Sequence, residues 1–253
     1  MSPTDITAAL LVIGDEILSG RTKDRNIGIL ADFLAARGIE LREVRVVPDD
    51  IAAIVAAVNA LRPRHTYVFT TGGIGPTHDD VTAEAVAAAF GVPLVEDPRA
   101  IALMLRRITS EHLNEARRRM ARIPQGAALV ENAVSAAPGF RIGNVIVMAG
   151  IPAIVEAMLA AVAPKLQTGQ RTIAKTIEVG DMPEGAFAAE LAAEAAQHPA
   201  VSIGSYPSYK DGKFANQIVV RGKDAGEVES AVTAIEALIA RLRAEGKDKY
   251  TIT

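Results

Sequence analysis

The chain of 253 residues contains no cysteine, and this absence removes several classes of function at once. Without a thiol there can be no disulfide framework, no thiolate nucleophile and no cysteine-ligated zinc or iron–sulfur centre. The charge imbalance is also small, with a formal net charge of −3. This mixed charge argues against a dedicated nucleic-acid-binding protein, and we expect no clear nucleic-acid partner.

Long hydrophobic runs are also lacking. The longest apolar stretches, such as residues 8–13, fall far short of the roughly 20 residues that a membrane span requires. The first residues, Met1-Ser2-Pro3-Thr4-Asp5, do not show the basic segment and apolar segment of a signal peptide. We therefore expect a cytoplasmic protein with no membrane association.

The first half of the chain alternates short apolar runs with helical patterns. Strands are predicted at residues 8–13, 41–47 and 67–71, and a helix with one apolar face is predicted after each of them. Three such repeats indicate an α/β fold with a mostly parallel, doubly wound sheet. Ligands of such sheets bind beyond the carboxyl ends of the strands.

The pattern changes after residue 90. Residues 98–122 read as two helices that meet near Asn114, followed by strands at 127–130 and 141–148, with a turn at Gly143-Asn144. A helix at 151–166 completes a first domain, which we place at residues 1–167.

Residues 170–247 form a predicted second domain of different character. A strand at 173–179 and a helix at 184–196 precede a hairpin, 201–206 with 214–221, across the turn Lys210-Asp211-Gly212. A last helix follows at 225–243. This βαββα pattern predicts a small α+β module, and it carries no obvious site residues.

The segment from Thr70 to Thr82 carries the strongest chemical signal. Gly72, Gly73 and Gly75 follow a strand and precede a helix, so backbone N–H groups and the helix dipole suit a phosphate. Asp79 and Asp80 would repel that phosphate unless a divalent cation joined them, as Mg²⁺ does in many phosphate sites. The alternatives remain open that Asp80 only caps the helix and that Asp79 is a solvated loop acid.

A second polar loop, residues 14–20, follows the first strand and contains Asp15 and Glu16. Its glycine spacing and Arg21 differ from a P-loop, and no G-x-G-x-x-G pattern indicates a nicotinamide dinucleotide site. Both loops lie at strand carboxyl ends, so we expect them at one crevice. Simple turn chemistry is the alternative for the two acids.

Arginines are concentrated between residues 106 and 122. A consecutive run on a helix cannot present every member to one ligand, so a solvated or ion-paired surface is the favoured interpretation. The alternative is that one of them reaches a phosphate. The cluster comprises Arg106, Arg107, Arg117, Arg118, Arg119 and Arg122.

The motifs Gly14-Asp15-Glu16-Ile17-Leu18, Asp24-x-Asn26 and Thr70–Thr82 resemble the MoaB/Mog molybdopterin-binding domain. The resemblance is to the form at the N-terminus of the competence/damage-inducible protein CinA, and it covers roughly residues 5 to 167. It implies a three-layer α/β/α fold that binds a phosphate-bearing pterin or adenine nucleotide at the sheet edge. It also implies a homo-oligomer, a dimer or trimer, and the tail is similar to the KH-like segment of CinA-type proteins.

By this resemblance and the loop chemistry, we expect catalytic roles for Asp15, Glu16 and Asp80. Asp79 and Asp80 are the expected ligands of a divalent metal, Mg²⁺ or Co²⁺, and molybdopterin is a possible further ligand. The expected ligand-binding residues are Gly14, Asn26, Thr71, Gly72, Gly73, Gly75, Pro76, Thr77, Gly150 and Pro152.

Three functions follow from the resemblance. The leading one is an enzyme, a metal-dependent pyrophosphatase acting on ADP-ribose-like nucleotides. The alternatives are a molybdopterin adenylyltransferase-like enzyme of molybdenum cofactor biosynthesis and a non-catalytic pterin- or nucleotide-binding protein. The last gains support from residues 149–154, where this chain has Ala-Gly-Ile-Pro-Ala-Ile in place of the usual Pro-Gly-x-Pro, often followed by Glu-Met.

Overall fold

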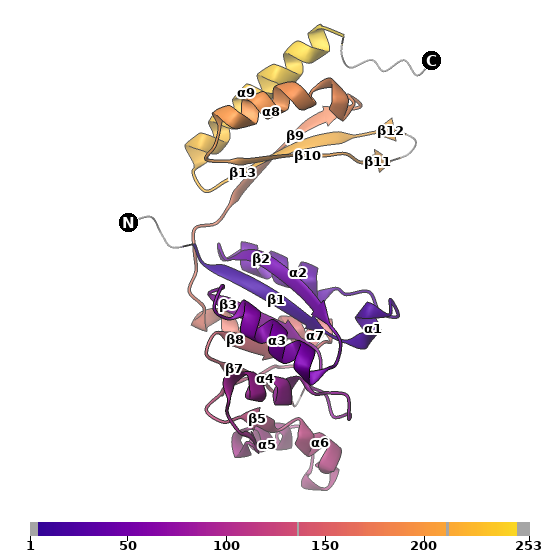
Figure 1. Cartoon of the computed structure of the whole chain (residues 1–253), viewed down its shortest axis with the longest axis vertical. Coiled ribbons are helices and arrows are strands. Elements are labelled where there is room, and N and C mark those ends of the chain that lie inside the picture. The colour runs from indigo at the N-terminus through magenta and orange to yellow at the C-terminus, as the bar shows by residue number, and fades with distance from the viewer. Residues whose placement is uncertain (1–4, 136, 211–212, 247–253) are drawn as a thin grey trace. The chain divides into compact units, whose positions relative to one another are not determined.

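The computed structural model describes residues 5–135, 137–210 and 213–246 (Figure 1). The chain divides into two compact units, Met1–Gly169 and Gln170–Thr253. None of the helices within the described residues is both long and apolar enough to cross a membrane.

The first unit is built on a six-stranded sheet, and its first four strands in spatial order run parallel. Ile13 pairs with Val47 and Thr71 pairs with Met148, so the carboxyl ends of these strands align along one edge. The prediction of a mostly parallel α/β sheet is confirmed. In spatial order the strands are β2 (Glu40–Val47), β1 (Thr7–Ile13), β3 (Tyr67–Thr71), β8 (Val145–Met148), β7 (Gly139–Ile142) and β6 (Ala128–Val130), the last two antiparallel.

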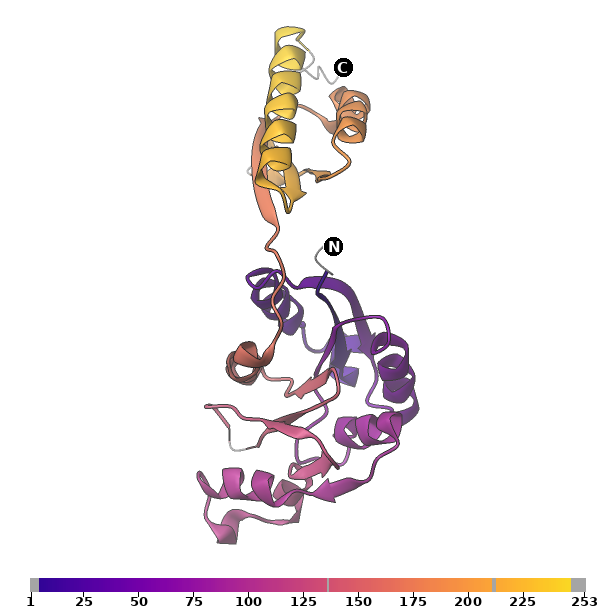
Figure 2. The same cartoon turned by 90° about the vertical axis from the view of Figure 1, so that its left-hand side faces the viewer.

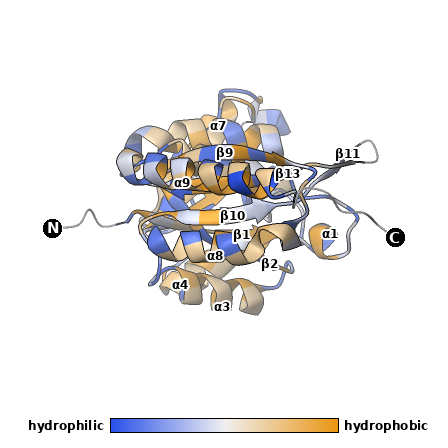
Figure 3. Cartoon of the chain, turned by 90° about the horizontal axis from the view of Figure 1, so that it is seen from above, coloured by the Kyte–Doolittle hydropathy of each residue, from blue (hydrophilic) through white to orange (hydrophobic). Residues whose placement is uncertain are grey.

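Helices cover both faces of this sheet and give three layers (Figure 2). One face packs on α2 (Asn26–Ala35) and α7 (Pro152–Val162), and the other on α3 (Ile51–Leu61), α4 (Thr82–Phe90) and α5 (Pro98–Leu105). Alanine is frequent in α3 and α4, which appear mainly in pale orange in Figure 3. Because β1 and β3 are covered on both sides, they carry the continuous apolar runs that identified them.

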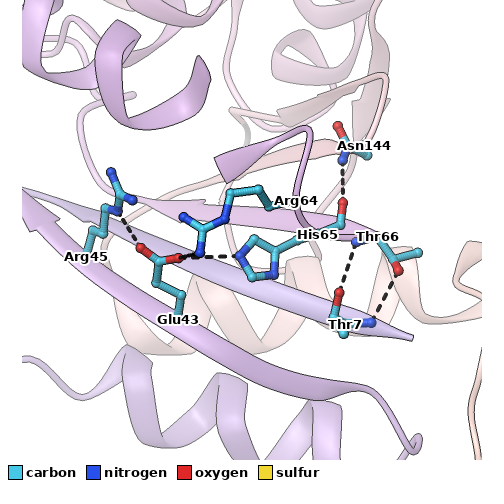
Figure 4. Close-up of polar contacts among 7 residues, drawn as sticks. All are labelled: Thr7, Glu43, Arg45, Arg64, His65, Thr66 and Asn144. Atoms are coloured by element: carbon cyan, nitrogen blue, oxygen red, sulfur yellow. Dashed lines mark hydrogen bonds and ion pairs between the residues drawn. The ribbon is translucent and has the colours of Figure 1, made fainter. Parts of the chain in front are cut away.

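Glu43 lies within the edge strand β2 and is surrounded by basic side chains (Figure 4). Its carboxylate lies 2.7 Å from Arg45 Nε, 3.2 Å from Arg64 and 3.5 Å from the His65 ring. The hydrogen bond from Arg45 is the main reason that the pKa of Glu43 is lowered. Asn144 donates to the carbonyl of His65 and so fixes the start of β3.

The structure contains two α-helices within residues 98–122, but it corrects the prediction that they meet near Asn114, because the first ends well before that residue. Helix α5 ends at Leu105, the one-turn η1 (Ser110–His112) and the short α6 (Glu115–Arg119) follow, and the chain then forms β5 (Arg122–Pro124). Strand β5 pairs with β4 (Leu94–Glu96) in a small antiparallel sheet. These three-residue strands are too short to show an alternating pattern, so tertiary pairing decided a conformation that local sequence did not indicate.

The second unit contains the predicted βαββα elements. Its antiparallel sheet has the order β10-β13-β9, with α8 and α9 packed together on one face. Part of the predicted turn, Asp211-Gly212, lies outside the described residues. The elements are β9 (Ile173–Gly180), η3 (Glu184–Ala186), α8 (Ala188–Gln197), β10 (Ser202–Tyr206), β11 (Tyr209–Lys210), β12 (Lys213–Phe214), β13 (Asn216–Gly222) and α9 (Ala225–Ala244).

Candidate functional site

The glycine loop, residues 72–80, leaves β3 at the carboxyl edge of the sheet. Gly72 has a φ of +104°, and a Cβ there would lie 2.1 Å from the carbonyl oxygen of Ile13. Only glycine permits this approach, because a side chain would collide with the backbone at the end of β1. The loop therefore crosses directly over the neighbouring strand end.

Asp80 fixes the shape of this loop. Its carboxylate accepts hydrogen bonds from the N–H of Gly75 at 2.7 Å, from the N–H of Thr77 at 2.8 Å and from the Thr77 hydroxyl at 2.5 Å. It does not cap α4, whose N-cap is Val81, so the capping alternative is wrong. Asp80 holds the loop in place, and its expected catalytic and metal-binding roles remain predictions.

The first polar loop forms the one-turn helix α1 (Asp15–Leu18) and is joined to the end of β2 through Asp49. The N–H of Asp15 donates to Asp49 Oδ2 at 3.0 Å. A Cβ on Gly73 would lie 3.4 Å from Asp49 Oδ1, so the glycine loop passes the same carboxylate. Asp49 thus lies between the two loops that the sequence indicated.

The electrostatic environment of Asp49 is negative. Partial burial raises the pKa of Asp49, and the neighbouring carboxylates of Glu16, Asp15 and Asp79 raise it further. The hydrogen bond from Asp15 N–H opposes this shift. The exposed Asp79 has a lowered pKa instead, chiefly because the Thr77 side chain hydrogen-bonds to it. Among the described residues, the charged groups acting on Asp49 are therefore carboxylates.

A third loop, at the start of α7, completes the edge. The Asn26 side-chain amide donates to the carbonyl of Gly150 at 2.8 Å, and a Cβ on Gly150 would lie 3.4 Å from Gly72 Cα. Pro152 occupies the first turn of α7. Asn26 Oδ1 and Thr71 Oγ1 are buried and have no hydrogen-bond partner within the described part of the chain. Buried polar atoms normally have a hydrogen-bond partner, so these two unsatisfied atoms are exceptions in the fold.

Two adjoining cavities lie along this edge. The larger, about 580 Å³, is lined by residues including Glu16, the glycine loop and Gly150. The smaller, about 310 Å³, is lined by Glu16, Asn26, Thr71 and Gly150 among others. Of the predicted site residues, these linings include Glu16, Asn26, Thr71, Gly72, Gly73, Gly75, Pro76, Asp80, Gly150 and Pro152. The other four, Gly14, Asp15, Thr77 and Asp79, belong to the same loops without lining either cavity.

Sequence reasoning overlooked several residues of this edge. Asp49 also follows a strand of the parallel sheet, which was an available signal, but no motif singled it out. The N-cap of α3 is Asp50, which accepts from Ala53 N–H at 2.8 Å. The larger cavity also contains side chains from the segment between α5 and β5, for which no local motif exists: Met104, Ile108, Arg117 and Met120.

The donor set of the site consists of oxygen atoms. No group of three or more metal-ligating side chains occurs within the part of the chain that the structure describes. Mg²⁺ commonly binds through one or two carboxylates together with substrate phosphates. Asp49, which has negative neighbours and lies beside the glycine loop, fits a hard divalent cation bound in this way.

Comparison with known proteins agrees with this architecture. Residues 9–168 match the family described as "Probable molybdopterin binding domain", and residues 171–245 match "FAD synthase, middle domain". The crystal structure of "the protein CinA with unknown function" from Thermoplasma acidophilum is 34% identical, with a TM-score of 0.59. That similarity covers 64% of this chain and 99% of the other.

Two curated relatives extend over both units. A protein of Thermococcus kodakarensis is 35% identical over 93% of this chain and 98% of its own length. The "Probable FAD synthase" of Caenorhabditis elegans is 32% identical over 94% of this chain, but this chain spans only 51% of that relative. With the first unit matched almost throughout, the chain belongs to the molybdopterin-binding domain family, in its CinA-like form.

Proposed function

We propose that the chain is a metal-dependent pyrophosphatase that hydrolyses adenine dinucleotides of the ADP-ribose type. The observation that carries this proposal is Asp49, a partly buried carboxylate among other carboxylates, placed against a glycine loop suited to phosphate. A bound phosphate and a carboxylate without a neutralising partner repel each other when they lie side by side. A cation between them would remove this repulsion.

The glycine loop binds one phosphate of the substrate. Its backbone is already shaped by Asp80, and α4 begins directly behind it, so the N-terminal dipole of α4 favours an anion at this point. Asp49 and the neighbouring Asp15, Glu16 or Asp79 would hold the divalent ion. That ion would neutralise part of the phosphate charge and would lower the pKa of a water molecule bound to it.

The reaction consumes one water molecule. The oxygen of water forms a bond to one phosphorus atom, and the bond from that phosphorus to the bridging oxygen breaks. ADP-ribose would give AMP and ribose 5-phosphate, and the released proton passes to the carboxylates and solvent. The carboxylates at this edge orient the water and accept its proton.

The decisive experiment is product analysis with ADP-ribose and FAD, each incubated with the full chain in Mg²⁺, in Co²⁺ and in chelator. Metal-dependent release of AMP supports the proposal. Asp49→Asn, which removes the charge and keeps an acceptor for Asp15 N–H, should abolish the release. Glu43→Gln, on the same strand but in the basic cluster, is the matched control and should retain it.

Absence of AMP release under every metal would contradict the proposal. If molybdopterin with ATP then gave an adenylylated product, the chain would be an adenylyltransferase, in keeping with the family match to molybdopterin binding. If ligands raised the melting temperature without any product, the chain would be a pterin- or nucleotide-binding protein.

A further inference from the structure

The larger cavity has a second wall that the motifs did not indicate. One wall is the glycine loop, and the other consists of Met104, Ile108, Arg117 and Met120. Three of these side chains are apolar, and the lining of the cavity as a whole is mainly apolar. Methionine sulfur makes favourable contacts with aromatic rings, so this wall suits a flat heteroaromatic base.

Arg117 is the only basic residue in the lining of this cavity. Its guanidinium donates to the carbonyl of His112, and its backbone N–H is capped by Asn114 at 3.0 Å. The bond to His112 engages one guanidinium N–H and leaves most of the five N–H donors of the side chain for another acceptor. Among the described residues, no carboxylate lies within ion-pair distance of Arg117.

Three of the neighbouring arginines have partners away from the larger cavity. Arg118 is exposed and pairs with Glu96 at 2.9 Å, and Arg106 lies 3.7 Å from Glu131. Arg107 donates to the backbone carbonyl of Ala133. Arg117 therefore differs from these three arginines in its place, while Arg119 and Arg122 line a smaller cavity against the glycine loop. Of the cluster 106–122, it alone lines the larger cavity.

We infer that Arg117 is a substrate-binding residue that contacts a phosphate of the nucleotide, while Ile108 and Met120 hold the base. This inference rests on the proposed function, because it assigns the adenylate half of that substrate to the larger cavity. A guanidinium can bind two phosphate oxygens at once, and Arg117 lines the same cavity as the glycine loop. The segment from α5 to β5 thus determines which nucleotide is accepted.

The test compares AMP with adenosine, so that it does not depend on turnover. Binding of each to the full chain is measured by calorimetry for the wild type, Arg117→Ala and Arg118→Ala. A lost charged contact to phosphate weakens binding by about 10-fold or more. Arg117→Ala should weaken AMP binding by that factor and leave adenosine unchanged, and Arg118→Ala should change neither.

A second pair of measurements separates the base from the phosphate. Met120→Ala should weaken AMP and adenosine alike, and Arg117→Lys should restore part of the AMP affinity. If the wild type hydrolyses ADP-ribose, Arg117→Ala should raise KM much more than it lowers kcat. Equal behaviour of Arg117→Ala and Arg118→Ala would overturn the inference even in an active enzyme. A chain without hydrolysis would leave the AMP result intact and overturn only the proposed reaction.

Discussion

Two carboxylates associated with strand β2 have opposite surroundings. Glu43, within the strand, has Arg45, Arg64 and His65 around it, and its pKa is lowered. Asp49, two residues beyond the strand end, has only carboxylates acting on it, and its pKa is raised. The first is compensated by the protein itself. The second lacks a compensating charge, which is the condition of a group that serves a ligand.

The difference teaches how structural and functional acids can be distinguished in one sheet. A carboxylate with basic partners lowers the free energy of the folded chain. A carboxylate among other carboxylates raises that free energy unless a cation is bound beside it. Strand-end position alone does not separate the two cases, because Asp50 is also near this end and only caps α3. The four predictions below test this contrast, from the largest expected effect to the smallest.

The largest difference should appear in turnover. Asp49→Asn is expected to reduce metal-dependent hydrolysis of ADP-ribose by about 100-fold or more, because a metal ligand is removed. Glu43→Gln should stay within about 3-fold of the wild type, because its cluster does not contact the site. Steady-state AMP release measures both. Equal losses in the two variants would mean that the contrast in charge has no functional meaning.

Asp80→Ala should act through the shape of the loop. Three hydrogen bonds from Gly75 and Thr77 would be lost, so turnover should fall by about 10-fold or more, with a loss of about 1–2 kcal/mol in stability. Asp80→Asn, which keeps acceptor capacity, should recover part of the stability. Chemical denaturation and AMP release provide the two readouts. Unchanged turnover in Asp80→Ala would exclude a role for the fixed loop.

Divalent metal should stabilise only chains that keep the uncompensated site. Saturating Mg²⁺ or Co²⁺ at 100 times its Kd should raise the unfolding free energy of the wild type by about 2.7 kcal/mol. Glu43→Gln should show the same increase, and Asp49→Asn much less. Thermal denaturation with and without chelator tests this. A metal response in Asp49→Asn as large as in the wild type would place the metal elsewhere.

The smallest effects concern the pH dependence of folding stability without metal. The Asp49 and Glu43 variants should change the melting temperature in opposite directions. The folded-state pKa of Asp49 lies above the ordinary aspartate pKa of 3.8. The wild type therefore loses stability as the pH rises from about 3.8 through that folded-state pKa. Asp49→Asn should therefore raise Tm at pH 7 by about 1–2 °C, and the gain should vanish in acid.

The folded-state pKa of Glu43 lies below the ordinary glutamate pKa of 4.5. The contribution of Glu43 to folding stability is therefore fully present above pH 4.5 and is lost as the pH falls through the folded-state pKa. Glu43→Gln should therefore lower Tm at pH 7, and the difference from the wild type should disappear in acid. Melting curves between about pH 3 and 7 compare the two variants. If the difference in Tm between variant and wild type changed with pH in the same direction for both variants, the environments of Asp49 and Glu43 would not be electrostatically opposite.

The sequence was sufficient to predict the parts whose signals are local. Continuous apolar runs identified β1 and β3, and the spacing of Gly72, Gly73 and Gly75 after β3 located the glycine loop. The sequence was not sufficient where long-range packing decides. Strands β4 and β5 pair in a small sheet of their own, although they are far apart in the sequence, and no local pattern indicates this pairing. For that reason the second wall of the cavity, including Arg117, had no signal that a motif could provide.

The hydrogen bonds between Asp80 and its own loop also bear on how fast and how tightly an anion can be bound. Ordering one backbone residue costs about 1–2 kcal/mol, and with a mobile loop this cost would reduce the binding free energy of every ligand. Here the N–H groups of Gly75 and Thr77 are already held by the protein. A ligand of this loop would therefore meet a backbone that is already ordered, and it would bind through groups other than the Gly75 and Thr77 N–H groups that Asp80 occupies.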